Sequence, residues 1–401
     1  MNYENATLRD LVADQARRCG KRVFLEYGGH SYSYVAVDEK TDRVATALSR
    51  MGLKHGDRIA LLLSNRPEFL FFFLGAPKIG VIPVPIDPTA LPDEIGFAIE
   101  HSGSTAVVTE RLYLEYREQL PNVGKWIVVD DPGFAQAPFE GLERGRILGF
   151  WPDLEADDPA VISYTRGTTG DPKPVVLTHR NLISNCAQTL QPFRIDETDR
   201  FFCALPLSSV AAEVLLVLLP WIAGGSCILG EAYAARLLVE LEESRATVLA
   251  GTPALYEMIA GSTGFAHSNI STLRLAICYS GPVGRKILRQ FEERHDILIV
   301  EGYGLVEATC LTCANPYTGV RKPGSLGLPL PGLECRIVDA EGHYLGPGKT
   351  GEIVVRGPNV MAGYYRSPRE TEAALRGGWL HTGDFGYADP DGYYFLQRAR
   401  R

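Results

Sequence analysis

Apolar blocks of strand length alternate with segments of helical period from the N-terminus to about Thr309. The strand-like blocks are Arg58–Leu63, Ala106–Val108, Trp126–Val129, Ala160–Tyr164 and Thr247–Ala250, and the helical segments include Lys40–Met51 and Pro67–Ile79. Such alternation is typical of α/β layers whose strands are buried between helices. We therefore predict two doubly wound α/β subdomains within residues 1–310.

The pattern changes after Thr309, where short β-rich runs are separated by turns rich in glycine and proline. These runs are Glu334–Val338, Glu352–Val355 and Tyr393–Leu396. Short strands with turn residues at close intervals favour antiparallel pairing. We predict a smaller, barrel-like β-rich subdomain over residues 311–396.

Composition and charge exclude several classes of protein. The chain has 401 residues, with 40 Lys and Arg against 48 Asp and Glu, and a formal charge of −8. Without a dense cationic surface, nucleic acid is not an expected partner. The longest apolar stretch, Val214–Ala223, contains Pro220 and is shorter than the roughly 20 residues of a membrane-spanning helix. The acidic N-terminal segment does not resemble a secretory signal, so we expect a cytoplasmic protein whose cysteines are reduced packing residues.

The segment Ser163–Asn181, with the sequence SYTRGTTGDPKPVVLTHRN, predicts a phosphate-binding loop between a strand and a helix. Glycine allows the backbone to approach a ligand closely, threonine hydroxyls and backbone N–H groups donate to phosphate oxygens, and Lys173 adds a mobile positive charge. The spacing differs from GxxxxGK[ST], because no Ser or Thr follows the lysine. The alternative is a polar hairpin turn without a ligand.

Two further motifs indicate a nucleotide site. In EGYGLVEAT, Tyr303 offers a flat face for stacking on a purine, and the Glu307 carboxylate is a suitable ligand for a hard cation. In HTGD, the Asp384 carboxylate is suited to accept hydrogen bonds from two hydroxyl groups. The alternative for the first motif is a buried tyrosine beside a surface glutamate.

Together these motifs resemble the adenylate-forming superfamily, which comprises acyl- and aryl-CoA synthetases, luciferases and the adenylation domains of peptide synthetases. Besides the phosphate loop, the matching segments in order are Gly56–Phe69, Pro77–Asp87, Cys203–Glu213, Glu301–Thr309 and His381–Arg401. The resemblance extends over essentially the whole chain. It implies an acyl-CoA ligase that uses ATP, forms an acyl-adenylate with Mg²⁺, and transfers the acyl group to CoA.

The resemblance also implies roles for individual residues. Lys173 and Glu307 would be catalytic, and Glu307 would take part in binding Mg²⁺. Tyr303 would stack on adenine, and Asp384 would hold the ribose. The other residues implied in nucleotide binding are Thr165, Arg166, Gly167, Thr168, Thr169, Gly170, Gly281, Pro282, Glu301, Gly302, Gly304, Val306 and Arg398.

The implied acyl site carries small side chains. It comprises Ser208, Ser209, Val210, Ala211, Ala212, Tyr279 and Ser280. Many relatives have an aromatic residue and a histidine where this chain has its two serines, so side-chain volume is lost. We expect either a bulky, mostly apolar carboxylic acid in this space, or neighbouring side chains that refill it.

Three substitutions fall on positions that handle ATP in relatives. Arg166 replaces a serine, Pro174 replaces a glycine and thus removes a backbone N–H, and Val306 replaces a threonine hydroxyl. One interpretation is that the chain makes the adenylate poorly from ATP and retains thioester formation with CoA. The other is that Arg166 acts as a further phosphate-binding cation.

The end of the sequence resembles the hinge that precedes a mobile C-terminal domain in relatives. Residues 397–401 would be a stub of this hinge, and the isolated fragment would be weakly active. Transfer to a carrier-protein thiol and non-catalytic binding of an acid or its adenylate remain alternatives to CoA ligation.

Cys310 and Cys313 form a CxxC pair without a second one, so packing is expected rather than metal binding. His179 could contact phosphate or cap a helix, and His381 is expected to be structural.

Overall fold

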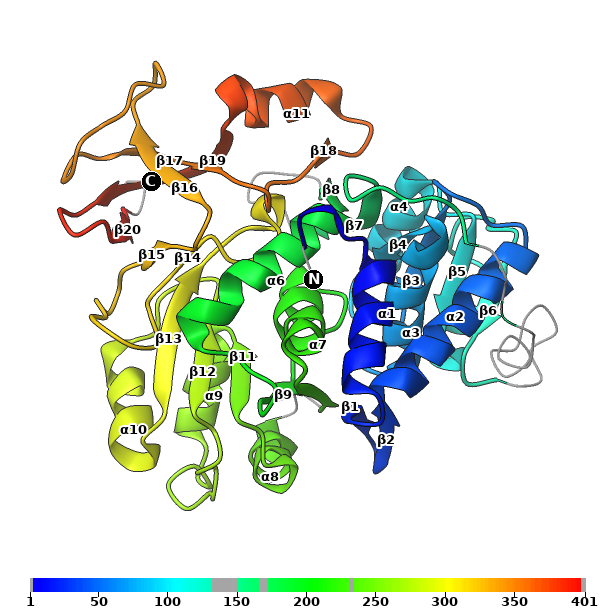
Figure 1. Cartoon of the computed structure of the whole chain (residues 1–401), viewed down its shortest axis with the longest axis horizontal. Helices are drawn as coiled ribbons and strands as arrows, with labels where there is room; N and C mark the ends of the chain where they lie inside the picture. Colours follow the sequence, from blue (N-terminus) through cyan, green and yellow to red (C-terminus); the bar gives the residue numbers. More distant parts are fainter. Residues whose placement is uncertain (1–2, 132–146, 148–150, 166–171, 231–233, 398–401) are drawn as a thin grey trace. The chain divides into compact units, whose positions relative to one another are not determined.

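The structure is a computed structural model that describes residues 3–131, 147, 151–165, 172–230 and 234–397. The chain forms two compact units. The first comprises Met1–Ile183, Pro206–Glu213 and Tyr364–Arg366, and the second comprises Ser184–Leu205, Val214–Gly363 and Ser367–Arg401. Figure 1 shows the elements of both.

A four-stranded parallel sheet, in the order β4-β3-β5-β6, organises the first unit. Its strands are β3 (Arg58–Leu62), β4 (Ile82–Pro85), β5 (Ala106–Thr109) and β6 (Trp126–Val128). The helices are α1 (Leu8–Cys19), α2 (Tyr34–Arg50), α3 (Pro67–Gly75) and α4 (Pro92–Ser102), with 3₁₀ turns at Tyr3–Asn5, Ala76–Ile79 and Arg111–Tyr116. Helices α1, α2 and α3 pack together, and α3 also contacts β3 (Figure 1).

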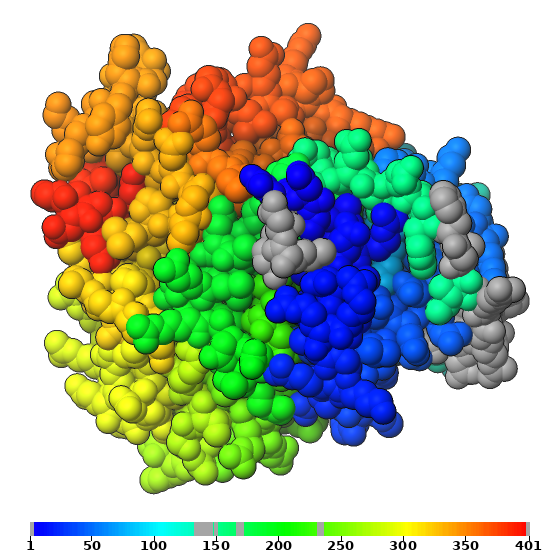
Figure 2. Space-filling view, in the orientation of Figure 1, coloured from blue at the N-terminus to red at the C-terminus, as the bar shows by residue number. Residues whose placement is uncertain are grey.

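Local sequence explains where these helices begin. Helix α1 starts with a capping box, in which the Thr7 side chain accepts from Asp10 N and the Asp10 carboxylate accepts from Thr7 N. Helix α3 has Pro67 at its first position, where the missing N–H costs no helical hydrogen bond. In Figure 2, α1 (dark blue) lies on the visible surface. Its outer face carries exposed Arg17, whereas Leu8, Leu11 and Val12 are buried.

Two antiparallel hairpins complete the first unit. Strands β1 (Val23–Tyr27) and β2 (His30–Ser33) pair across Gly28 and Gly29, which both have positive φ. Strands β7 (Pro159–Thr165) and β8 (Lys173–Thr178) pair from Pro159 opposite Thr178 to Thr165 opposite Lys173. Helix α6 (His179–Phe193) follows β8 directly.

The second unit contains a larger, mainly parallel sheet, with strands in the order β15-β14-β13-β12-β11-β9-β10. Its strands are β9 (Arg200–Cys203), β10 (Ser226–Leu229), β11 (Val248–Gly251), β12 (Leu275–Cys278), β13 (Leu298–Tyr303), β14 (Cys313–Ala314) and β15 (Leu328–Pro329). The helices are α7 (Leu219–Ala223), α8 (Ala234–Ser244), α9 (Pro253–Gly261) and α10 (Arg285–His295). Helices α8, α9 and α10 cover one face of the parallel strands, where Leu249, Tyr256 and Phe291 share a buried cluster (Figure 1).

A curled antiparallel sheet forms the β-rich part of the second unit, in the order β16-β17-β19-β20. Its strands are β16 (Glu334–Val338), β17 (Gly351–Arg356), β19 (Leu380–Ala388) and β20 (Tyr394–Leu396). The chain between β17 and β19 contains β18 (Gly363–Tyr364), α11 (Pro368–Ala374) and a 3₁₀ turn at Arg376–Gly378, and a further 3₁₀ turn at Val306–Ala308 lies between β13 and β14 of the larger sheet. The predicted fold class, α/β layers followed by a smaller β-rich part, is confirmed.

The apolar stretch Val214–Ala223 lies in a π-helical segment, Ala212–Leu218, and in α7. Among the helices that the structure describes, none is long and apolar enough to cross a membrane. None of the eight cysteines, all of which lie in the described part of the chain, forms a disulfide, and six of them are buried.

Candidate active site

The phosphate-loop segment of the first unit forms a hairpin. Thr165 ends β7 opposite Lys173, which begins β8, and the Thr165 hydroxyl donates to the Lys173 carbonyl at 3.4 Å. The Lys173 ammonium lies over the Tyr364 ring, 5.3 Å from its centroid. Arg166, Gly167, Thr168, Thr169 and Gly170 lie outside the described residues. The strand pairing therefore holds Thr165 and Lys173 together at the two ends of the loop.

Pro174 lies within β8, opposite Tyr164 of β7. Proline has no N–H to give to the ladder, but its carbonyl accepts a hydrogen bond from Tyr365 N at 2.8 Å. The substitution thus removes one backbone donor beside Lys173 and leaves the local strand pairing intact.

His179 begins α6, and its side chain caps another helix. Its Nδ1 accepts a hydrogen bond from Leu8 N, the first residue of α1, at 3.1 Å. The ring is fully buried, and burial lowers its pKa to about 4. Of the two predicted roles, the structure supports capping. His381 contacts the Glu352 carboxylate, with 2.7 Å between Nδ1 and Oε2.

The acyl segment of the first unit is a tight turn leading into the π-helical segment. Leu207 N donates to the Asn65 side chain at 2.8 Å, which fixes the start of the turn. The Ser209 hydroxyl donates to Pro206 O at 2.8 Å and accepts from Ala212 N at 3.3 Å. Ser208 and Ser209 are half-buried, and the three residues that follow, Val210, Ala211 and Ala212, are buried. The Ser209 hydroxyl is thus already engaged by the backbone.

Sequence reasoning did not single out Glu213, which follows this turn directly. Its side chain is 0% exposed, and neither carboxyl oxygen has a hydrogen-bond partner. Burial raises its pKa well above the ordinary value. The available signal was one acid inside the otherwise apolar run AAEVLLVLLP.

In the second unit, the predicted adenine and ribose residues are in direct contact. Tyr303 ends β13 and Asp384 lies on β19, 81 positions further along the chain. The Tyr303 hydroxyl donates to Asp384 Oδ2 at 2.6 Å. Burial and, after it, the nearby Asp384 carboxylate raise the pKa of Tyr303, so the phenol remains protonated and can donate. The bond uses Oδ2 and orients the carboxylate, which is only half-buried.

Glu301 holds two loops around the same strand. Its Oε1 accepts from Val283 N at 2.9 Å, and its Oε2 accepts from Gly324 N at 3.0 Å. Burial raises its pKa, and these two backbone donors counteract part of the shift. Glu301 therefore fixes the turn that carries Gly281 and Pro282, which are half-buried and exposed respectively.

The glycine after Tyr303 is required by close packing. A Cβ atom at Gly304 would lie 1.4 Å from Cys310 O, so only glycine fits. Gly302 is also tightly packed, since a Cβ atom there would lie 2.9 Å from the Leu311 side chain. In the neighbouring turn, Ser280 has a φ of 74°. Tyr279 N donates to Gly251 O at 3.1 Å, and burial raises the pKa of the Tyr279 phenol.

Val306 and Glu307 lie on a short 3₁₀ turn, and both are half-buried. The turn is anchored at its end, because the Thr309 hydroxyl donates to Asn359 O at 2.7 Å and Asn359 Nδ2 donates to Ala308 O at 2.9 Å. Met361 N donates to Glu307 O at 2.9 Å. The fold thus holds the Glu307 backbone firmly on a turn that leaves its side chain partly accessible. Arg398 lies outside the described residues.

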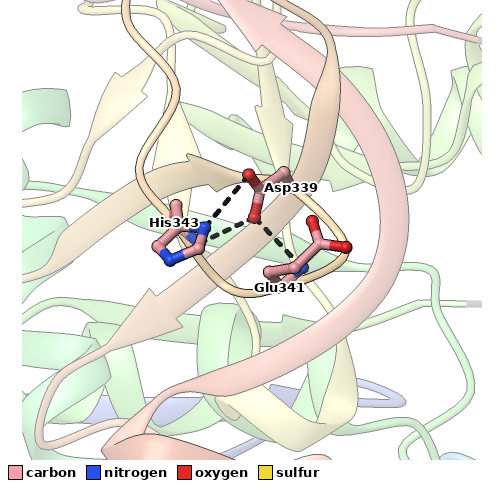
Figure 3. A group of neighbouring side chains, drawn as sticks. All are labelled: Asp339, Glu341 and His343. Atoms are coloured by element: carbon pink, nitrogen blue, oxygen red, sulfur yellow. Dashed lines mark hydrogen bonds and ion pairs between the residues drawn. The ribbon is translucent and has the colours of Figure 1, made fainter.

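One group of three metal-ligating residue types occurs in the described part of the chain, on the exposed loop after β16 (Figure 3). It consists of Asp339, Glu341 and His343. The Asp339 carboxylate accepts from Glu341 N at 3.1 Å and from His343 N at 2.8 Å, and the bond from His343 N is the main cause of the lowered pKa of Asp339. The carboxylate therefore closes a turn. Glu307 and the Cys310–Cys313 pair do not belong to this group.

Comparisons with known proteins find relatives over almost the whole length of the chain. A family model described as AMP-binding enzyme matches residues 12–365. A feruloyl-CoA synthase from Amycolatopsis sp is 31% identical over 397 residues, covering 98% of this chain and 78% of that protein. A long-chain-fatty-acid–CoA ligase from Yersinia pestis is 30% identical over 432 residues, which cover 98% of this chain and 75% of that protein. The fold is similar to that of the anthranilate CoA ligase AuaEII in complex with anthranoyl-AMP, with a TM-score of 0.93, 23% identity, and coverage of 99% and 79%.

Proposed function

Because this chain belongs to the family of AMP-binding enzymes, whose members similar to it include acyl-CoA ligases, we propose that it is an acid–thiol ligase of the AMP-forming type. Its substrates would be a carboxylic acid, ATP and CoA. The observation that carries the proposal is the hydrogen bond between Tyr303 and Asp384, which joins an aromatic ring and a carboxylate suited to a nucleoside.

In this reaction the substrate carboxylate attacks the α-phosphorus of ATP and releases pyrophosphate, and the CoA thiolate then displaces AMP. Catalysis would depend on positioning and on charge stabilisation. Lys173, at the end of the phosphate-loop hairpin, would neutralise phosphate charge. Asp384, oriented by Tyr303, would accept hydrogen bonds from the ribose hydroxyls.

Glu307 would contribute to holding Mg²⁺. Its carboxylate is the oxygen ligand that this ion prefers, and the side chain is half-buried on an anchored turn. When bound, the ion would neutralise the phosphate charge that develops during transfer.

We further propose that thioester formation is the stronger half-reaction and that adenylation from ATP is impaired. Pro174 has lost a backbone N–H beside Lys173, and Val306 presents no hydroxyl from its half-buried position. Each hydrogen bond to a charged group is worth about 1.5–3 kcal/mol, which corresponds to about one to two powers of ten in rate.

The test compares ATP–pyrophosphate exchange with CoA-thioester formation from supplied acyl-adenylate. We expect slow exchange and faster thioester formation, and Val306→Thr should raise exchange by about 10-fold or more. Rapid exchange by the unaltered chain would mean that Arg166 compensates as a phosphate-binding cation. Because the isolated fragment is expected to be weakly active, failure of the full-length protein to form the thioester from adenylate is the result that would contradict the ligase itself.

The acid would be bulky and mostly apolar. Small side chains line the turn from Ser208 to Ala212, and the last three of these residues are buried and apolar. A competition between acids of increasing size, measured by thioester formation from their adenylates, tests this. Preference for the smallest acids would contradict it.

A further inference from the structure

Glu213 is an exception among the buried acids of the first unit. Its backbone N–H donates to Ser209 O at 3.0 Å, but both carboxyl oxygens lack a hydrogen-bond partner in a side chain that is 0% exposed. Within the part of the chain that the structure describes, no other carboxyl group is buried without a hydrogen-bond partner. Buried polar groups are nearly always bonded, so an unpartnered one requires an explanation.

Other buried glutamates show what a structural role looks like in this molecule. Glu110 of the first unit accepts from Ser64 N at 2.6 Å and pairs with Arg66 at 3.2 Å. Glu301 of the second unit accepts from two backbone N–H groups. Glu213 makes no such contact, so it does not stabilise the chain in the absence of a ligand.

The position of Glu213 suggests which ligand would satisfy it. It follows the turn Ser208–Ala212 directly and lies in the first turn of a π-helical segment. Turns of π-helix are rare and occur frequently at functional sites. The Ser209 hydroxyl is already bonded to Pro206 O and Ala212 N. Glu213 is therefore a polar group without a hydrogen-bond partner directly after the Ser208–Ala212 turn.

We propose that Glu213 determines acyl specificity by accepting a hydrogen bond from a donor group, an amine or a hydroxyl, on the acyl part of the substrate. The inference rests on the proposed function, because it takes the Ser208–Ala212 turn as part of the acyl site. A substrate with such a donor satisfies the buried carboxyl, whereas an entirely apolar acid leaves it unbonded. A site built to bond a polar group rejects analogues that lack the group.

The two kinds of donor have different proton balances. Burial raises the pKa of Glu213 well above its ordinary value, which favours the neutral acid over the carboxylate when no ligand is bound. A protonated amine would convert Glu213 to a carboxylate and release its proton to solvent. A hydroxyl would donate to the carboxyl oxygen without any net release of a proton.

The test uses non-hydrolysable acyl-sulfamoyl adenosine mimics in matched sets, each set comprising an unsubstituted acid, its amino derivative and its hydroxy derivative. Calorimetry on the purified chain gives the affinities. We expect a donor-bearing mimic to bind at least about 10-fold more tightly than its unsubstituted counterpart. In Glu213→Leu the donor-bearing and unsubstituted mimics should bind equally. Glu213→Gln keeps an acceptor oxygen, so it should retain the preference for the hydroxy derivative. Titrations of the amino derivative in buffers of different ionisation enthalpy should show proton release on binding to the unaltered chain and no proton release on binding to Glu213→Gln.

Ser163→Ala is a matched control, because Ser163 is also buried with an unbonded hydroxyl but lies on β7. This variant should keep the wild-type ratio. Equal affinity for the three members of every set, or an unchanged ratio in Glu213→Leu, would overturn the inference and leave the proposed function standing. Failure of all mimics to bind the unaltered chain would contradict the proposed function instead. If Glu213→Leu does not fold, the wild-type ratios and Glu213→Gln decide.

Discussion

Replacing Glu213 with leucine should stabilise the protein, although the residue is fully buried. An unbonded buried polar group costs about 1–3 kcal/mol, and leucine has a similar volume without polar atoms. We therefore expect Glu213→Leu to raise the free energy of unfolding by about 1–3 kcal/mol near pH 4.5 and below, where Glu213 is protonated in both the folded and the unfolded chain. Urea unfolding followed by fluorescence or circular dichroism measures this change.

The stabilisation that Glu213→Leu produces should also depend on pH. The folded-state pKa of Glu213 is raised above its ordinary value of 4.5, so the unfolded chain releases this proton at lower pH than the folded protein does. Below about pH 4.5 Glu213 is protonated in both states, so the free energy cost of burying it is at its smallest there. As pH rises from there toward the folded-state pKa, the unfolding free energy should fall by up to about 1.4 kcal/mol per pH unit. Glu213→Leu and Glu213→Gln should both remove this dependence.

Glu301→Leu is the matched control, because Glu301 is also buried but accepts two backbone hydrogen bonds. It should lower the unfolding free energy by about 1–3 kcal/mol, the opposite sign to Glu213→Leu. Destabilisation by Glu213→Leu, or an unchanged pH dependence, would refute the reasoning, because it would mean that Glu213 has a bonding partner in the unliganded protein.

Two further variants test contacts that shape the candidate site. Burial lowers the pKa of His179 to about 4, so its contribution to stability is complete above about pH 6.5 and is lost as pH falls toward about 4. His179→Gln can still accept a hydrogen bond from Leu8 N but cannot be protonated, so it should remove this part of the loss of stability between about pH 6.5 and 4. Thermal melts over this pH range measure the effect, and an unchanged dependence of stability on pH would contradict the role given to His179. Gly304→Ala, whose Cβ would lie 1.4 Å from Cys310 O, should abolish AMP binding, whereas Gly261→Ala, with nothing within 4 Å, should not. Normal binding by Gly304→Ala would show that the loop can move aside.

The sequence alone was sufficient to predict the layers of the fold. Continuous apolar blocks of strand length, such as Arg58–Leu63, favour buried strands between helices, and β3 occupies most of that block. Glycine-rich and proline-rich turns after Thr309 correctly indicated antiparallel pairing. The predicted adenine and ribose residues could be named from motifs, but their direct hydrogen bond joins residues 81 positions apart and required the fold.

Other features of the site depend on tertiary partners that no local pattern reveals. Glu301 was predicted only as a nucleotide-binding residue, whereas its carboxylate bonds the backbone at Val283 and Gly324. Ser209 was predicted to contact the acyl group, whereas its hydroxyl bonds the turn that it belongs to. Glu213 was passed over because one acid in an apolar helix usually faces solvent or a partner, and here it has neither.

The most direct test of the account is the affinity of the chain for AMP compared with 2′,3′-dideoxy-AMP. If Asp384, oriented by Tyr303, holds the ribose, AMP should bind at least about 10-fold more tightly than the dideoxy compound, and Asp384→Ala should bind both equally. Tyr303→Phe keeps the ring and removes only the bond to Asp384, so it should retain part of the preference. Equal binding of the two nucleotides by the unaltered chain would contradict the nucleotide site and, with it, the proposed ligase.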